Sequence, residues 1–359
     1  MRLITEPEVV STVLKHHTYE AAEKFIQEVC WRTYWKGWLE ARSGVWKSYG
    51  DELTRARDRW DTNIQYRSAI EGRTGIDCFD AFAQELLASG YLHNHARMWF
   101  ASIWIFTLRL PWVLGADFFF RHLLDGDPAS NTLSWRWVAG LQTRGKHYVA
   151  TADNIRRYTA GRFRVDTPLA ENPEPLLEAG GIPNPIPLPS RRDPLPQGTT
   201  GLLISEDDLG AAEWLAVSSQ IEAVAFAMPF AAYASHGIAP HVIEFRRRAM
   251  VSAATTHGEK SDANITIIDA AEDTASGILS WAREHRLRSV IMAEPAVGLW
   301  DELKNEVAQQ LRNTGISLIF RRHPWDEAFY PHATKGFFHL KTAIPGLIKR
   351  DLTSLQTNA

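Results

Sequence analysis

Residues 123–137 read LLDGDPASNTLSWRW, and this short stretch brings acidic, amide and indole side chains together in an otherwise apolar region. Its polar and aromatic members are two carboxylates around a glycine, an amide, and two tryptophans on either side of an arginine, namely Asp125, Asp127, Asn131, Trp135 and Trp137. Three interpretations are open at this point. The stretch could form a surface turn, a metal-binding loop, or the wall of a pocket for a large aromatic ligand with a polar edge.

Metal binding is the least favoured of these interpretations. A calcium loop needs further oxygen ligands at regular spacing and a bidentate glutamate, and the stretch lacks both. His93 and His95 are two residues apart on a predicted helix, so their rings point to different faces. Cys30 and Cys78 are the only cysteines and form no C-x-x-C pair. We therefore expect no metal and no disulfide framework, as is typical of a protein in the reducing cytosol.

The overall composition is typical of a globular protein. The chain has 359 residues, 45% of them hydrophobic and 23% charged, which is long enough for two domains. The N-terminus is mixed and charged, unlike a signal peptide, and no apolar run reaches the length of a membrane span. We expect a cytoplasmic protein that does not contact a membrane.

The net charge of −3 hides an asymmetry between the two parts of the chain. Residues 1–163 hold 21 Lys and Arg against 18 Asp and Glu, whereas the remaining residues hold 18 against 24. A mildly basic first part is compatible with an anionic partner such as nucleic acid, but so small an excess does not by itself indicate one.

The first 163 residues read as one helix after another. Ten of the 14 tryptophans lie within residues 31–137, and a bulky core side chain is the default role for any one of them. Apolar residues recur at three- and four-residue spacing, which predicts helices separated by Gly, Asp and Pro turns. The predicted helices cover residues 20–40, 77–90, 93–110, 116–123 and 132–140.

The pattern changes after residue 163. Nine of the 18 prolines lie between Pro168 and Pro196, which predicts an extended linker over 164–198. Short β-rich runs then alternate with amphipathic stretches at 271–286 and 298–314, and this predicts a doubly wound parallel sheet in an α/β domain over 199–348. No G-x-G-x-x-G follows a strand, so no dinucleotide site of that kind is indicated. The predicted strands are 201–207, 223–229, 263–269, 289–295 and 317–323.

Polar side chains at the start of the predicted helix 93–110 favour the pocket interpretation of the opening stretch. Asn94 and Arg97 begin an otherwise apolar helix, where polar groups need partners. A pair between Arg97 and Asp125 would satisfy both charges. Asp127 and Asn94 would then be left to face a ligand.

Four motifs, in order and at suitable separations, resemble the helical FAD-binding domain of the photolyase/cryptochrome family. They are FIQEVCWRTYW (25–35), GRTGIDCFDA (72–81), GYLHNHARM (90–98) and LLDGDPASNTLSWRW (123–137). The resemblance implies an all-α domain that binds FAD, and a flavin whose redox states are tuned by a nearby carboxylate. By this resemblance the acids of residues 123–131 line the edge of the flavin.

The resemblance also implies individual roles. Arg32 would contact the flavin or its phosphates, Asn94 would lie near flavin N5, and the Arg97–Asp125 pair would lie over the ring system. The pyrimidine edge would meet Asp127, and Asn131 is a further cofactor-side candidate. A chain of tryptophans would carry electrons from the surface to the flavin, and it comprises Trp135, Trp112 and Trp60.

Lesion-side positions match the family as well. Glu28 would hydrogen-bond a pyrimidine dimer, Trp31 and Trp137 would sandwich it, and Asn131 and Met98 would line the cavity. Aromatic walls suit an extruded base pair. Family enzymes that act on the (6-4) photoproduct carry histidine at the position of Met98, so the match favours cyclobutane dimers.

The chain departs from the family pattern in two places. The family has an α/β antenna domain before the flavin domain, whereas here the α/β region comes last, which we interpret as a rearranged domain order. The Thr-Ser-x-Leu-Ser loop that holds the FAD phosphates has no good copy, and Thr199–Thr200 is a weak substitute. After Trp137 the amino-acid sequence also departs from that of common photolyases. In this segment Lys146, Arg156 and Arg157 are candidates to meet phosphates of FAD or DNA.

The leading interpretation is a lyase of the deoxyribodipyrimidine photolyase type, which uses FAD and blue light to repair cyclobutane pyrimidine dimers in UV-damaged DNA. A cryptochrome-like photoreceptor or flavin redox protein without repair is the alternative, and a relic that binds nucleotide without photochemistry is the third. A second, antenna chromophore is left open, as are the oligomeric state and the choice between single- and double-stranded DNA.

Overall fold

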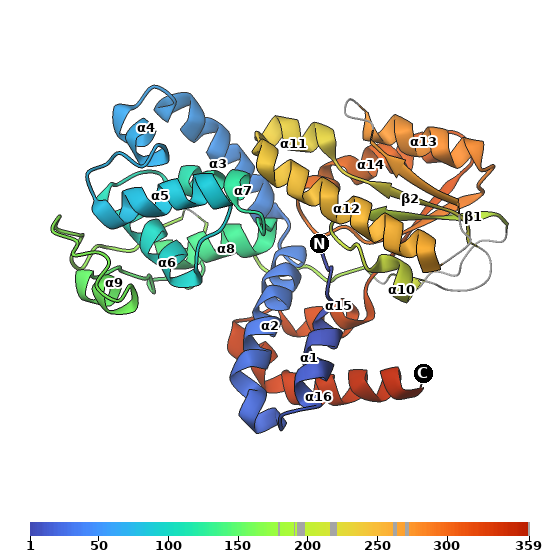
Figure 1. Cartoon of the computed structure of the whole chain (residues 1–359), viewed down its shortest axis with the longest axis horizontal. Helices are drawn as coiled ribbons and strands as arrows, with labels where there is room; N and C mark the ends of the chain where they lie inside the picture. The colour runs from blue at the N-terminus through green and yellow to red at the C-terminus, as the bar shows by residue number, and fades with distance from the viewer. Residues whose placement is uncertain are drawn as a thin grey trace. The chain divides into compact units, whose positions relative to one another are not determined.

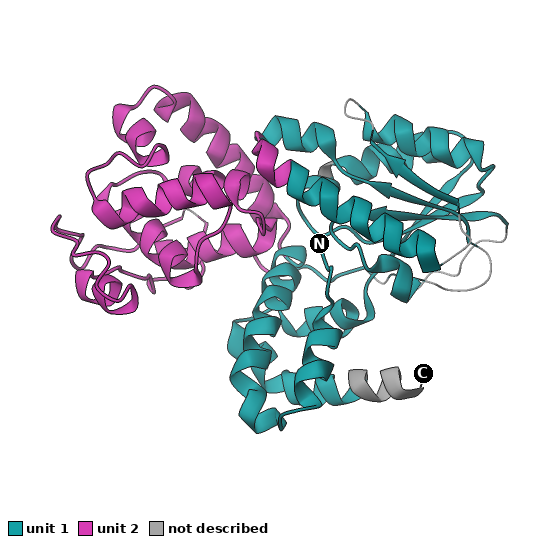
Figure 2. Ribbon diagram, viewed as in Figure 1, with its two compact units in different colours: residues 1–41, 185–236, 244–359 teal, residues 42–184, 237–243 magenta. Residues whose placement is uncertain are grey.

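The computed structural model describes residues 1–178, 180–189, 191, 198–215, 221–260, 264–269 and 273–357. The chain forms two compact units, which are described here one at a time (Figure 2). Unit 1 comprises residues 1–41, 185–236 and 244–359, and unit 2 comprises residues 42–184 and 237–243. Part of the predicted linker, at 179, 190 and 192–197, lies outside the described residues. The predicted domain boundaries stay predictions, because compactness alone does not show which segments fold independently.

Unit 2 is helical, as the spacing of apolar residues predicted. Its core is dense in aromatic rings, with Phe79, Phe100 and Trp104 fully buried. The helices surround this cluster, and α9 lies at one end of the unit (Figure 1). They are α3 (Gly44–Trp60), α4 (Ile64–Ile70), α5 (Asp77–Ser89), α6 (Asn94–Ser102), the π-helix η1 (Ile103–Thr107), α7 (Trp112–His122), α8 (Pro128–Ala139) and α9 (Ala152–Tyr158).

Several helix boundaries differ from the prediction, including the start of α7 at Trp112 instead of residue 116, and two of the differences have a clear local cause. The expected helix 93–110 runs as α6 and then as the π-turn η1, in which the Leu108 N–H reaches the carbonyl of Ile103 at 2.9 Å. The helix expected at 132–140 begins earlier, at Pro128, because Asp127 caps it by accepting from the Ser130 N–H at 2.8 Å. An acidic cap followed by proline at the first helical position is a start signal that the apolar pattern alone does not show.

The contact between α7 and α8 depends on a glycine. Trp135 of α8 is buried, and its indole lies directly against the backbone of α7 at Gly115. A Cβ at position 115 would lie 2.3 Å from Trp135 Cη2 and 2.9 Å from Trp104 Cε2, closer than any real contact. The glycine therefore gives the indole its space.

The sheet of unit 1 confirms the predicted doubly wound α/β fold. Its five parallel strands have the order β3-β2-β1-β4-β5. Helices lie on both sides of it (Figure 1). The strands are β1 (Thr200–Ser205), β2 (Ile221–Ala227), β3 (Asn264–Ile268), β4 (Ser289–Ala293) and β5 (Ser317–Arg321), and the helices between them are α10 (Ala211–Leu215), α11 (Phe230–His236), α12 (Pro240–Lys260), α13 (Thr274–Glu284) and α14 (Leu299–Arg312).

Neighbouring side chains along the central strand β2 pack against helices on opposite faces of the sheet. Ala225 and Ala227 of β2 share a buried cluster with Trp281 of α13 and Val307 of α14. Phe226, between them in sequence, instead borders α10 and α12. Because side chains alternate along a strand, both faces of the sheet are covered and both are apolar.

Unit 1 also contains helices from both ends of the chain. Gly37 of α2 packs against Tyr330, whose ring would lie 2.7 Å from a Cβ at position 37. The segment predicted as helix 20–40 therefore packs on the C-terminal part of the chain. These elements are α1 (Glu6–Leu14), α2 (Tyr19–Glu40), α15 (Pro324–Phe329), the 3-10 helix η2 (Tyr330–His332) and α16 (Phe337–Thr357). In the described part of the chain, none of the helices combines the length and apolarity needed to span a membrane.

We expect Gly115→Ala to destabilise unit 2 by about 1–3 kcal/mol, because the new methyl group must push the Trp135 indole out of its packing position. Denaturant unfolding followed by tryptophan fluorescence measures this. Gly50→Ala is the matched control, since Gly50 lies within α3 with nothing inside 4 Å of its added Cβ. Alanine is the better helix former, so this control should be neutral or stabilising by up to about 1 kcal/mol. Equal unfolding midpoints for the two variants would contradict the packing argument.

Candidate functional site

The centre of the candidate site in unit 2 is an ion pair between the start of α6 and the turn after α7. Arg97 Nη2 donates to both oxygens of Asp125, at 3.1 and 3.0 Å, and Arg97 Nε donates to the Leu92 carbonyl at 2.8 Å. The two segments are also joined through the backbone, because the Leu124 N–H donates to the Gly90 carbonyl. The predicted Arg97–Asp125 pair is thus present. It lies at the surface, since the Asp125 side chain is 59% exposed.

The other polar members of the opening stretch have structural roles that the sequence did not reveal. Asp127 caps α8 as described above. Asn131 is buried, and its amide nitrogen donates to the Ala116 carbonyl of α7 at 2.8 Å. Both residues therefore fix α8 in place. The Asp-Pro pair could have indicated the cap, whereas the bond to Ala116 depends on the tertiary structure.

The side chains beside the ion pair are open to solvent. Asn94 is exposed, and Met98 is half-buried one turn further along α6. Trp137 is 37% exposed and stacks on Tyr148, with the ring centroids 5.9 Å apart. Asn94, Met98, Trp137 and the ion pair all belong to unit 2.

The three tryptophans predicted to carry electrons occupy different environments in unit 2. Trp135 is buried and meets Phe119 and Trp104 edge-on, with centroids 5.1 and 6.2 Å away. Trp112 is buried beside Tyr49 at 5.8 Å, and Trp60 is partly exposed at the edge of the core. Trp104, which the motif comparison did not single out, is therefore a tryptophan neighbour of Trp135.

The remaining predicted site residues lie on α2, in unit 1. Glu28 is exposed, and Trp31 stacks almost flat on Phe337 of α16, with centroids 3.7 Å apart and an interplanar angle of 8°. Arg32 forms an ion pair with Glu6 of α1. Burial opposes ionisation of Glu6, but Arg32 and Arg2 together lower its pKa to about 2. Phe337 is a partner that sequence reasoning missed, because it is far from Trp31 in the chain.

The end of β1 in unit 1 carries a buried acid. Glu206 accepts hydrogen bonds from Tyr233 Oη at 2.6 Å and from the indole N–H of Trp300. Burial, together with the neighbouring Asp207, raises the pKa of Glu206 to about 7, against the opposing charge of Arg246. The strand order reverses between β1 and β4, and doubly wound sheets bind ligands beyond the carboxyl ends of strands at such a point.

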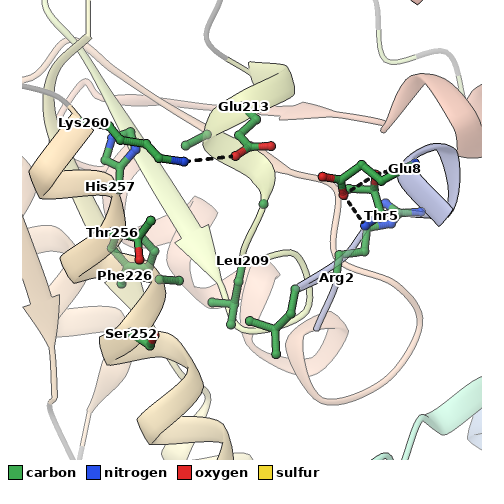
Figure 3. Close-up of a pocket in the computed structure, with 14 residues that line it drawn as sticks. Arg2, Thr5, Glu8, Leu209, Glu213, Phe226, Ser252, Thr256, His257 and Lys260 are labelled. Atoms are coloured by element: carbon green, nitrogen blue, oxygen red, sulfur yellow. Dashed lines mark hydrogen bonds and ion pairs between the residues drawn. The ribbon is translucent and has the colours of Figure 1, made fainter. Parts of the chain in front are cut away.

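A second feature of unit 1 is a cavity of about 340 Å³ beside α12 (Figure 3). Phe226 and Leu209 give it an apolar lining, and the hydroxyls of Ser252 and Thr256 also face it. Its ionisable residues already have partners, as in the Lys260–Glu213 pair at 3.9 Å and the hydrogen bonds that join Thr5 to Glu8. The cavity is of mixed polarity and carries no uncompensated cluster of charge.

The threonines considered as a substitute phosphate loop lie at the start of β1. Thr199 Oγ1 donates to the Arg286 carbonyl at 2.7 Å, and Thr200 Oγ1 is buried 2.9 Å from Ser289 Oγ. Both hydroxyls therefore hydrogen-bond within the sheet region, Thr199 to the connection before β4 and Thr200 to β4 itself. Over the described ranges, no group of three or more His, Cys, Asp or Glu side chains could hold a metal ion.

Comparison with known proteins finds a family model that matches the motif-bearing segment. Residues 25–163 match the family model for the FAD binding domain of DNA photolyase. This segment is therefore similar to that domain, and the resemblance seen in the four motifs is confirmed. No solved structure gives a significant match.

Several curated relatives are similar over the same part of the chain. The deoxyribodipyrimidine photo-lyase of Streptomyces griseus is 32% identical over 181 residues, which are 46% of this chain and 39% of that protein. Its counterpart in Neurospora crassa is 34% identical over 123 residues, 34% of this chain and 20% of that protein. The protein of that name in Escherichia coli is 30% identical over 129 residues, which are 36% of this chain and 27% of that protein. The chain thus spans well under half the length of these relatives.

The side chains of unit 2 suit FAD in kind. An amide at Asn94, a guanidinium at Arg97 and carboxylates at Asp125 and Asp127 offer both donors and acceptors to the polar edge of a flavin. The hydroxyl of Thr132 on α8 is buried and has no hydrogen-bond partner among the described residues. The helix that Asp127 caps therefore carries a polar group with unused hydrogen-bonding capacity. The donor set therefore fits the cofactor that the family model names.

We expect Glu206 to make the stability of unit 1 depend on pH. A carboxyl whose folded pKa is raised binds its proton more tightly when folded, so stability falls as the pH rises from about 4.5 to about 7. Glu206→Gln should remove about 2–3 kcal/mol of this fall, since one pKa unit corresponds to about 1.4 kcal/mol.

Denaturant unfolding at a series of pH values, followed by circular dichroism, measures this difference. Glu222→Gln is the control, because Glu222 lies on the same sheet but is not buried. This variant should show the same dependence of unfolding free energy on pH as wild type. A Glu206→Gln variant that loses as much stability as wild type over this range would show that the carboxyl does not titrate there.

Proposed function

We propose that the chain binds FAD through its photolyase-type domain and repairs cyclobutane pyrimidine dimers in DNA under blue light. The observation that carries the proposal is the Arg97–Asp125 pair, which lies in two of the four family motifs and leaves Asn94 exposed beside it. When bound, FAD supplies a redox centre that light can excite. The relatives with the printed name deoxyribodipyrimidine photo-lyase support this substrate class.

The side chains of unit 2 would hold and orient the cofactor. Asn94 and Asp127 would hydrogen-bond its ring edge, and Arg97 and Asp125 would fix its position. Arg32 belongs to unit 1, where it pairs with Glu6, and its role at the flavin or its phosphates rests on the motif alone. A carboxylate held by an arginine keeps its charge close to the ring, which favours particular redox states. Asn131, buried between α7 and α8, would act by holding α8.

The tryptophans of unit 2 would supply electrons from the solvent side. Trp60 is partly exposed and Trp112 and Trp135 are buried, which is the order expected of a path running from the surface to the interior. Indole is readily oxidised and polarisable, whereas phenylalanine is not. The ring of Trp104 lies 6.2 Å from that of Trp135 and would give electrons a second route to the Trp135 indole.

On the lesion side of unit 2, Met98 would border the dimer and Trp137 would stack on it, while Asn131 would support them by holding α8. Glu28 and Trp31 belong to unit 1, and their roles, a hydrogen bond to the dimer and a second stacking surface, rest on the motifs alone. Trp137 is 37% exposed, so part of its ring is open to a base. For Trp31 a base would have to use the ring surface that Phe337 leaves free, or replace Phe337.

That stack on Phe337 is the observation that favours a second candidate function. With one face of Trp31 covered from within unit 1, the flavin and the tryptophans could serve a cryptochrome-like photoreceptor or a redox protein that repairs nothing. Lesion binding separates the two functions, because only repair requires selection of damaged DNA.

We expect the purified protein to contain non-covalent FAD and Asp125→Ala to bind it about 10-fold more weakly. The variant leaves Arg97 without its carboxylate partner, and hydrogen bonds to charged groups contribute about 1.5–3 kcal/mol before solvent screening. Titration of the apoprotein with FAD, followed by flavin fluorescence, gives the affinity. Asp51→Ala removes an exposed carboxylate from α3, elsewhere in unit 2, and should change nothing. A wild-type protein that takes up no FAD would refute the proposal.

The electron path predicts an effect of Trp135→Phe on FAD reduction in blue light with an external reductant. The rate should drop strongly, because phenylalanine cannot be oxidised in place of the indole. Trp99→Phe, which alters a tryptophan bonded to Asn154 and outside the path, should change the rate little. Similar rates in both variants would mean that the spacing of the three tryptophans reflects core packing.

Repair itself predicts that dimer-containing DNA binds better than intact DNA, since a damaged pair is easier to extrude. Trp137→Ala should weaken this preference by about 1–3 kcal/mol, the effect of one base–aromatic stack. Binding assays with matched oligonucleotides and chromatography of illuminated samples measure both steps. Ile64→Ala, which trims an apolar side chain that is 82% exposed, is the control. FAD-loaded protein that shows no preference and restores no thymines in light would favour the photoreceptor instead.

A further inference from the structure

The cleft beside α12 in unit 1 lies outside the segment that matches the family model (Figure 3). One of its walls is a face of α12, on which Ser252, Thr256 and Lys260 follow one another at four-residue spacing. The other wall is formed by the N-terminal segment with Leu3 and by α10 with Glu213. Its volume of about 340 Å³ is at the lower end of the range typical of small-molecule pockets. The size therefore suits a small metabolite.

The buried part of the lining is apolar. Phe226 of β2, Leu209 and Ala212 of α10 are all buried and all face the cleft. Leu3 also lines it, and its side chain is 56% exposed. An apolar group that entered the cleft would remove this leucine from water, which is favourable in proportion to the apolar area covered. The lining therefore favours a ligand with an apolar part.

The rim of the cleft carries opposite charges that hold each other loosely. Lys260 Nζ lies 3.9 Å from Glu213 Oε1, and the two side chains are 67% and 69% exposed. The pair joins α12 to α10 (Figure 3). An exposed pair at this distance contributes little to stability, so both groups can turn to a ligand at a small cost in free energy.

The other ionisable groups of the lining disfavour an anionic ligand. Glu8 is a second exposed carboxylate, and it accepts from the N–H and the hydroxyl of Thr5 at 2.7 and 2.8 Å. Arg2 is already paired with three carboxylates outside the lining. Burial and the neighbouring Lys260 lower the pKa of His257, so its ring is neutral at neutral pH. A phosphate would therefore meet more negative than positive charge here.

We propose that this cleft binds a free amino acid with an apolar side chain. The ammonium group would pair with Glu213 and the carboxylate with Lys260, because a zwitterion carries both charges on neighbouring atoms and matches the two signs at the rim. Its side chain would cover Leu3 and point toward Phe226. The hydroxyls of the α12 wall would add hydrogen bonds that fix its orientation. The inference goes beyond the proposed function and does not rest on FAD or DNA.

The test uses the full chain and L-leucine. Isothermal titration calorimetry should give a Kd of about 0.1–1 mM, the range expected for so small a ligand. Isocaproate is leucine without its ammonium group, and isopentylamine is leucine without its carboxylate. Each should bind about 10-fold more weakly or worse, because a hydrogen bond between charged groups is lost. Inorganic phosphate should bind more weakly than leucine.

Two substitutions at the rim locate the ligand. Glu213→Gln and Lys260→Gln should each weaken leucine binding about 10-fold. Glu213→Gln should also remove most of the advantage of leucine over isocaproate, and Lys260→Gln most of its advantage over isopentylamine. A purely structural role of either residue would not change these ratios. Leu3→Ala should weaken leucine binding about 3- to 10-fold through the lost apolar contact.

Lys341→Gln is the matched control. Lys341 lies 3.8 Å from Glu23, and this partly exposed pair joins α16 to α2 within the same unit. The variant loses a long ion pair between two helices, as Lys260→Gln does, but away from the lining of the cleft. It should bind leucine as tightly as wild type.

Several results would overturn the inference. They are a wild-type protein that gives no binding heat with leucine, equal affinity for leucine and both truncated analogues, tighter binding of inorganic phosphate, and unchanged leucine affinity in both rim variants. None of these measurements involves the flavin, light or DNA. Their failure would leave the proposed function in place, and a protein that repairs no dimers could still bind leucine.

Discussion

The close approach of the Trp135 indole to the backbone at Gly115 is the contact on which the arrangement of unit 2 depends. It allows α8 to lie against α7 at a distance that any larger residue at position 115 would prevent. The helix that is held in this way carries Asn131 and Trp137, and its cap is Asp127. A single glycine thus affects the position of three of the side chains that we propose for cofactor and lesion binding. The hydrogen bond from Asn131 to Ala116 adds a directional constraint to the same contact.

Unit 1 depends in a comparable way on buried charge. Arg2 is almost fully buried and forms ion pairs with Glu6, Asp208 and Asp326, which come from α1, the end of β1 and α15. A buried arginine with three carboxylates is tolerable only when every partner is in place, because each unpaired buried charge is strongly destabilising. The N-terminal helices are therefore tied to the sheet and to the C-terminal helices. This explains why α2 packs with Phe337 and Tyr330.

The two units share the residues that repair would require. The flavin-side ion pair, the tryptophans and Trp137 belong to unit 2, whereas Glu28, Trp31 and Arg32 belong to unit 1. In unit 1 these side chains already have intramolecular partners, Phe337 for Trp31 and Glu6 for Arg32. Repair would have to use them in addition to their packing roles, and a photoreceptor would not.

The sequence by itself determined the helical character of unit 2, the parallel sheet of unit 1, the resemblance of residues 25–163 to a photolyase FAD-binding domain and the pair between Arg97 and Asp125. The helices and the sheet follow from local periodicity, whereas the ion pair, whose residues are 28 positions apart, follows from two motifs with polar residues at fixed places. Only the tertiary structure decided that Trp31 stacks on Phe337, that Asn131 bonds the Ala116 carbonyl, and that Glu206 is buried between Tyr233 and Trp300. These contacts join side chains to partners in other elements that no motif links to them, and their formation depends on shape and burial, which periodicity does not encode.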